Sequence, residues 1–145
     1  RFAVPAASLG GNRRLYLDLG RVEVIARVLV NGKLLGSLWK PPHRIDLTDA
    51  VRAGNNSLEV QVTNLWPNRL IGDEQLPPEY DYGANAFAWN GGISKLPDWY
   101  RTGQPKPPGK RVAFTTWRHY AADSPLLESG LIGPVRLLGA RLIKL

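Results

Sequence analysis

The chain has 145 residues, enough for one domain with a hydrophobic core of its own. Hydrophobic residues make up 43% and charged residues 21%, a composition of folded globular proteins that excludes a disordered chain. The absence of cysteine excludes disulfides, thiolate metal sites and a cysteine nucleophile.

The formal net charge is +7, and the basic residues are scattered along the chain. The adjacent basic pairs are Arg13-Arg14 and Lys110-Arg111. A nucleic-acid-binding protein usually concentrates its charge on one element, so we expect no nucleic-acid partner. The longest apolar runs are a few residues, so we expect no membrane-spanning segment either. The chain opens without Met and without a signal peptide, which suggests a piece of a longer protein.

The first pattern along the chain is an alternation of period two. Leu15, Leu17 and Leu19 alternate with Tyr16 and Asp18, which predicts a half-buried strand. After Gly20, the alternation resumes over residues 22–30. The residues predicted to face the core on this second strand are Val22, Val24, Ala26, Val28 and Val30.

Asn31-Gly32 is the dipeptide that most readily forms a type I′ turn. It predicts a hairpin between residues 22–30 and a returning strand over residues 33–39. Pro41-Pro42 then interrupts the sheet, because proline cannot donate a ladder hydrogen bond. Trp39, at the end of the returning strand, is predicted to lie in the core.

Residues 43–47 predict a short strand, and residues 48–54 predict one helical turn with Thr48 or Asp49 as its N-cap and Gly54 as its stop. Period two returns over residues 57–64, where Leu58, Val60 and Val62 face inward. So many short strands joined by tight turns favour an antiparallel sandwich over a helical fold.

Residues 65–111 hold most of the prolines and show little alternation, which predicts a long loop-rich insertion. A strand is predicted over residues 112–120, with Trp117 in the core. Residues 134–145 predict one or two closing strands. The whole chain is therefore interpreted as a single all-β domain over residues 1–145.

Several motifs resemble known glycosidase domains. Leu17-Asp18-Leu19-Gly20, Val30-Asn31-Gly32 and Gly54-Asn55-Asn56-Ser57-Leu58-Glu59-Val60 resemble the galactose-binding-like jelly roll of family 2 glycosidases. A second group resembles the C-terminal β-sandwich of family 106 α-L-rhamnosidases. It comprises residues 63–73, 114–117, 124–127 and 130–135.

The resemblance implies an antiparallel jelly-roll sandwich that serves as a non-catalytic accessory domain of a secreted or periplasmic bacterial glycoside hydrolase. The implied partners are a plant or bacterial polysaccharide and the catalytic domain of the parent chain. The alternatives are an autonomous carbohydrate-binding module and a small independent hydrolase. Such domains usually carry two or more strands before the segment that resembles residues 1–5, so we expect a sheet edge that something must cover.

Candidate site residues lie mainly in the insertion. Asp73 and Glu74 are the carboxylates considered for glycoside hydrolysis, although a pair of Arg69 with Asp73 that pins the loop is the favoured interpretation. The residues predicted to contact sugar, by stacking or by bonding hydroxyl groups, are Trp66, Asn68, Arg69, Asp73, Trp89 and Trp99.

The sequence offers residues for two further kinds of site. His119, with Asp123 and Ser124 close by, could form a catalytic triad only if the fold brought them together. The resemblance admits a structural calcium ion, but the acidic residues Asp73, Asp81, Asp98 and Asp123 lack the spacing of a calcium loop, so no metal ligands are identified and no cofactor is expected.

Overall fold

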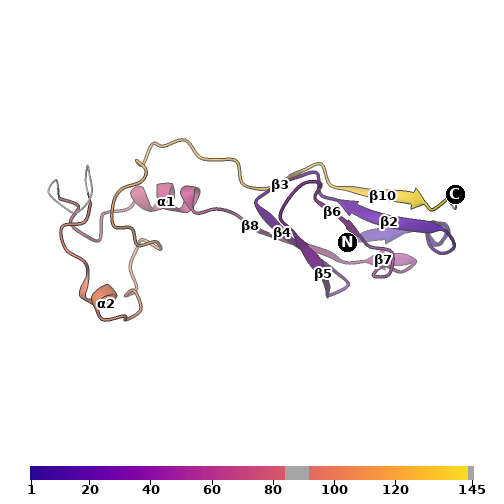
Figure 1. Ribbon diagram of the computed structural model, residues 1–145, viewed down its shortest axis with the longest axis horizontal. Helices are drawn as coiled ribbons and strands as arrows, with labels where there is room; N and C mark the ends of the chain where they lie inside the picture. The colour runs from indigo at the N-terminus through magenta and orange to yellow at the C-terminus, as the bar shows by residue number, and fades with distance from the viewer. Residues whose placement is uncertain (84–91, 144–145) are drawn as a thin grey trace. The chain divides into compact units, whose positions relative to one another are not determined.

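The computed structural model describes residues 1–83 and 92–143. These residues form two compact units (Figure 1). The strand unit comprises Arg1–Leu65 with Glu128–Leu145, and the loop unit comprises Trp66–Leu127. Trp89, one of the candidate sugar contacts, lies outside the described residues.

The strand unit holds every named strand of the described chain, and all of its strand pairings are antiparallel. The elements are β1 (Phe2–Val4), a 3-10 turn (Ala6–Ser8), β2 (Arg13–Asp18), β3 (Arg21–Glu23), β4 (Ile25–Val30), β5 (Lys33–Leu38), β6 (Arg44–Asp46), β7 (Gly54–Asn56), β8 (Leu58–Thr63), β9 (Gly130–Gly133) and β10 (Arg136–Arg141). The three-stranded sheets have the orders β10-β2-β6 and β5-β4-β8, and the two-stranded sheets are β1-β7 and β3-β9. This confirms the all-β antiparallel sandwich.

The core of the strand unit is built from the faces that the alternation predicts. Leu15, Leu17 and Leu19 are buried in or just beyond β2, and Val28 and Val30 are fully buried in β4. These side chains belong to one apolar cluster, against which Leu58, Val60 and Val62 of β8 pack partly buried. Removal of these apolar side chains from water is the main source of stability for such a sandwich.

The predicted hairpin forms. Strand β4 pairs with β5, and the two residues that connect these strands, Asn31 and Gly32, have φ angles of 51° and 81°. Both values are positive, as a type I′ turn requires. The Asn31 side chain also accepts a hydrogen bond from the backbone N–H of Ser57 (3.0 Å).

The predicted strand over residues 22–30 is divided in the structure. Arg21–Glu23 form β3 and pair with β9, whereas Ile25–Val30 form β4 and pair with β5 and β8. The change of partner falls at Val24, which is only half-buried rather than in the core. Alternation reports which side chains face inward but not which strand pairs with the backbone, so it runs through this break unchanged.

The predicted turn over residues 48–54 is a single turn, in which the N–H of Val51 donates to the carbonyl of Leu47 (3.2 Å). Its capping side chain is Asp46 and not Thr48 or Asp49, since the carboxylate of Asp46 accepts the N–H of Thr48 (2.8 Å). The turn ends at Val51, and Gly54, predicted as its stop, instead begins β7 with a positive φ of 85°.

Two tryptophans are more exposed than predicted. Trp39 and Trp117 are 66% and 42% exposed, so neither lies in the core. Trp117 also lies outside any strand. The predicted strand over residues 112–120 is wrong, because the described backbone there makes an isolated bridge between Gly92 and Trp117 and no ladder.

The loop unit contains two short helices, α1 (Pro67–Glu74) and α2 (Asp98–Arg101). Helix α1 corrects the prediction that Arg69, Asp73 and Glu74 lie on a loop. Pro67 occupies the first helical turn, where its missing N–H costs nothing because that position has no intrahelical acceptor.

Candidate functional site

Helix α1 presents both candidate carboxylates to the segment that follows residue 110. The predicted ion pair forms across one turn of the helix: the Arg69 guanidinium lies 2.5 Å from the carboxylate of Asp73, at i and i+4. Asp73 is only 3% exposed. A carboxylate this buried needs several hydrogen-bond donors to remain ionised.

Asp73 obtains its other donors from the backbone. Its two carboxylate oxygens accept the N–H groups of Ala113 (2.7 Å) and Val112 (3.3 Å). Burial by itself raises the pKa of Asp73, but these N–H groups and Arg69 outweigh it and hold that pKa below its usual value. Asp73 is therefore an ionised link between α1 and residues 112–113.

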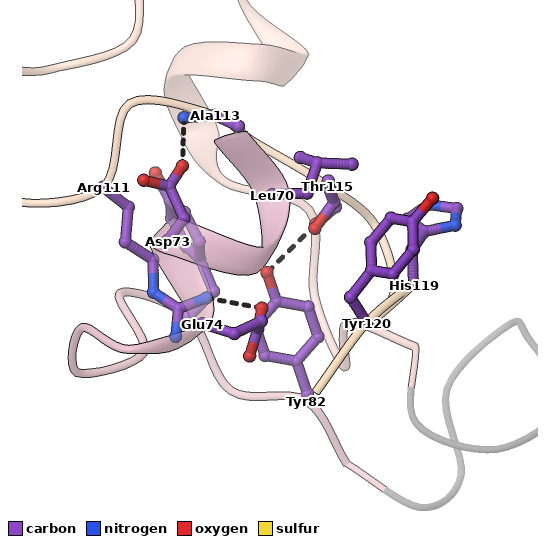
Figure 2. Close-up of a pocket in the computed structure, with 10 residues that line it drawn as sticks. Leu70, Asp73, Glu74, Tyr82, Arg111, Ala113, Thr115, His119 and Tyr120 are labelled. Carbon is purple, nitrogen blue, oxygen red and sulfur yellow. Dashed lines mark hydrogen bonds and ion pairs between the residues drawn. The ribbon is translucent and has the colours of Figure 1, made fainter. Parts of the chain in front are cut away.

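Glu74 is bound to a second cation, Arg111, whose side chain is almost fully buried (Figure 2). One Arg111 nitrogen lies 2.8 Å from a Glu74 oxygen. The remaining guanidinium N–H groups donate to the carbonyls of Leu76 (2.6 Å) and Pro77 (3.1 Å). Arg118 also lies 3.9 Å from the other carboxylate oxygen of Glu74.

Glu79 completes this arrangement of charges. It accepts hydrogen bonds from Lys106 (2.9 Å) and from the backbone N–H of Arg111 (3.0 Å). These two donors, Lys106 first, hold the pKa of Glu79 below its usual value. Three carboxylates of the loop unit thus each bind a segment that is distant in sequence.

This cluster of charges does not form a glycosidase site. Glycoside hydrolysis requires one carboxyl group that stays protonated, with a raised pKa, opposite a second carboxylate across an open cleft. Asp73 has a lowered pKa, and Glu74 is ion-paired to a buried guanidinium. The cavity that both residues line has a volume of about 10 Å³. That is about the space of one water molecule and far less than a sugar ring needs.

The rest of that cavity is walled by aromatic and polar side chains. Figure 2 shows Tyr82, His119 and Tyr120 around it, with the Tyr82 hydroxyl donating to the carbonyl of Thr115 (3.1 Å). The proposed triad does not assemble. A ring nitrogen of His119 is hydrogen-bonded to the indole N–H of Trp117 (2.6 Å), and the Ser124 hydroxyl accepts the N–H of Ala121 (2.9 Å).

The candidate sugar-stacking tryptophans have different surroundings. Trp99 packs edge-on against Phe114, with ring centres 5.0 Å apart, and its indole N–H donates to the Tyr80 hydroxyl (3.1 Å). It is therefore part of an aromatic cluster of the loop unit. Trp66 is 62% exposed. The Asn68 side chain makes two hydrogen bonds with the backbone of Leu127, at 2.8 and 2.9 Å, so it links residues 68 and 127.

Sequence reasoning missed Arg111, Glu79 and the aromatic cluster. In the sequence Arg111 stands out only because it follows Lys110. The residue to which it is ion-paired, Glu74, is 37 positions away in the chain. No local pattern marks a contact of that range. Among the described residues no group of three or more His, Asp or Glu side chains is placed to hold a metal ion, and no described helix is long and apolar enough to cross a membrane.

The known proteins to which the chain is similar include glycosidases. Over 94% of its length the chain is 47% identical to a protein from Formosa agariphila that is named as a β-glucuronidase. The structure superposes over 96% of the chain on a rhamnosidase from Novosphingobium sp. PP1Y, with a TM-score of 0.67 and 37% identity. No family model matches the sequence.

The chain is similar to a segment of each glycosidase. It spans only 11% of the Formosa protein and 10% of the Novosphingobium rhamnosidase. The sequence identities of 47% and 37% are high enough to indicate common ancestry with these segments as well as a shared fold. The structural comparison supports the all-β fold that the alternation predicts. Both comparisons support the resemblance to glycosidase domains.

Proposed function

We propose that this chain is a non-catalytic accessory domain of a glycoside hydrolase, of the type found at the C-terminus of family 106 α-L-rhamnosidases. The observation that carries the proposal is the similarity of nearly the whole chain to about a tenth of two much longer glycosidases. A segment of this size supplies a module of the parent enzyme. The proposal includes a secreted or periplasmic location and contact with the catalytic domain of the parent chain.

The chemistry of the loop unit supports a non-catalytic role. Asp73, Glu74 and Glu79 are all occupied by ion pairs and backbone N–H groups. Breaking these contacts to free a catalytic carboxylate would leave Arg111 buried without its partner, which is strongly destabilising. We therefore assign these carboxylates to stability rather than to turnover.

The test is an activity assay of the purified chain on nitrophenyl rhamnosides, glucuronides, galactosides and glucosides. We expect no hydrolysis above the rate of a buffer control. Turnover that is retained through purification and lost in Asp73→Asn or Glu74→Gln would overturn the proposal. Circular dichroism of both variants separates a lost reaction from a lost fold.

Carbohydrate binding by the isolated chain is the second candidate function, and the exposure of Trp66 favours it. An exposed indole can stack on the apolar face of a sugar ring. In affinity electrophoresis on plant and bacterial polysaccharides, Trp66→Ala should lose retardation. Trp39→Ala is the matched control, because Trp39 is exposed to a similar extent, 66% against 62% for Trp66. Equal losses in both variants would contradict a site at Trp66.

A further inference from the structure

Strands β2 and β10 of the strand unit lie side by side (Figure 1), and the start of β2 is paired with the end of β10. A basic groove lies at this point. The groove has a volume of about 380 Å³. We call it the arginine groove, and the residues that define it are Arg13, Arg14, Leu15, Leu137, Gly139 and Arg141. A second groove of about 400 Å³ shares Arg13 and Arg14 and extends past Gly10, Gly11 and Asp49.

Two of these arginines stand directly opposite each other. Arg13 and Arg141 are paired across the antiparallel ladder, so their side chains leave the same face of the sheet. Like charges at such positions repel and destabilise the sheet. Within the described part of the chain neither arginine makes an ion pair, and Arg14 reaches Asp46 and Asp49 only at 3.8 and 4.0 Å. The groove therefore has an excess of positive charge.

The floor of the arginine groove suits a ring rather than a bare ion. Leu137 is 41% exposed although it is on the same face as the buried Leu15, so an apolar surface is open at this point. Gly139 adds no side chain, and a Cβ atom built on it would have open space around it. Among the described strands, β10 is the edge of its three-stranded sheet.

We propose that the arginine groove binds an anionic saccharide, whose sugars carry carboxylate or sulfate groups. Guanidinium groups bind carboxylate and sulfate oxygens through paired charge-assisted hydrogen bonds. Leu137 and the open surface at Gly139 accept the apolar face of a sugar ring, and the volume is in the range of small-molecule sites. The choice of a saccharide over another organic anion rests on the function proposed above.

The test compares three variants of the full chain by affinity electrophoresis. Arg13→Gln/Arg141→Gln removes the paired charges. Gly139→Val fills the groove without changing charge, and valine suits a strand. Arg27→Gln/Lys33→Gln is the control, because it removes two exposed charges from β4 and β5 and leaves the groove intact. The probes are polygalacturonate, carrageenan, a neutral galactomannan and double-stranded DNA.

We expect retardation by polygalacturonate or carrageenan that falls with rising salt. It should be at least about tenfold weaker in the double arginine variant, because each charge-assisted contact contributes more than a neutral one. It should be weakened to a similar extent in Gly139→Val, whose side chain occupies the space of the sugar ring, and unchanged in the control. We expect the Arg13→Gln/Arg141→Gln variant to stay folded, because it removes the repulsion between two paired like charges. Circular dichroism checks this expectation.

Three results would overturn the inference: no retardation by either anionic polysaccharide, equal weakening in the control variant, or equal binding of DNA. These outcomes are separable from failure of the proposed function. If the anionic polysaccharides do not retard the chain and the chain hydrolyses no nitrophenyl glycoside, the groove assignment is wrong and the accessory-domain assignment stands. If the chain hydrolyses a nitrophenyl glycoside but is still retarded by an anionic polysaccharide, the non-catalytic accessory role is wrong and the groove assignment stands.

Discussion

Asn56 is a buried residue whose side-chain amide connects the hairpin turn at Asn31 to residues 52–54 of the strand unit. It is 2% exposed. Its amide nitrogen donates to the carbonyls of Arg52 (2.8 Å) and Gly54 (3.0 Å). Its amide oxygen accepts the N–H of Arg52 (3.0 Å) and the side-chain amide of Asn31 (2.9 Å). All the hydrogen-bonding capacity of Asn56 is thus used within the protein.

Replacing Asn56 by alanine removes these four hydrogen bonds. Each contributes about 1 kcal/mol of net stability. The backbone groups of Arg52 and Gly54 lie in exposed residues and regain hydrogen bonds to water, which reduces the loss. We therefore expect Asn56→Ala to lower the free energy of unfolding by about 2–4 kcal/mol.

Urea unfolding followed by circular dichroism at pH 7 measures this change. Asn55→Ala is the matched control, since Asn55 is the exposed neighbour and its side chain makes no hydrogen bond with any described residue. Its effect should stay within about 0.5 kcal/mol. A loss below about 1 kcal/mol in Asn56→Ala, or equal losses in both variants, would refute the assignment of this stability to the Asn56 hydrogen bonds.

Three other predictions concern single positions. Gly20 has a φ of 64°, and a Cβ on it would lie 2.5 Å from the backbone of Gly133, so Gly20→Ala should cost more than about 2 kcal/mol. Gly54→Ala has a similar φ but open space, and thermal unfolding should show a cost of only about 1–2 kcal/mol; equal costs would contradict the steric argument. Because the folded pKa of Asp73 is lowered, its stabilising contribution is complete above the unfolded pKa of about 3.9 and is lost as the pH falls through the folded value. The difference in unfolding free energy between the wild type and Asp73→Asn should therefore be constant above about pH 5 and shrink below pH 4; a constant difference down to pH 2 would exclude this titration. Val60→Ala should destabilise by about 1–3 kcal/mol in urea, since Val60 packs against the core; no change would show that β8 contributes nothing to it.

Local sequence patterns predicted much of the strand unit. Period two over residues 15–19 and 22–30 identified the faces that are buried, because a strand turns successive side chains to opposite sides whatever its partner is. Asn31-Gly32 predicted the hairpin because few residues adopt two consecutive positive φ angles. The Arg69–Asp73 pair was also predictable, since four residues separate its members.

The tertiary structure decided which segments pair and which residues are left exposed. The sequence over residues 112–120 alternates as a strand should, but the N–H groups of Val112 and Ala113 bond the carboxylate of Asp73 instead of a neighbouring strand. Trp39 is apolar, yet it lies one residue beyond the end of β5 and is 66% exposed.

The sequence by itself determined the buried faces of the strands and the turn at Asn31-Gly32, because alternation and tight turns depend on residues within a few positions of each other. The ionised links at Asp73 and Glu74 and the opposition of Arg13 to Arg141 were decided only by the fold. Their partners are 37 to 128 residues apart in the chain. Coulomb attraction and hydrogen bonding act over a few ångströms of space, so such contacts follow from where the backbone brings the residues together.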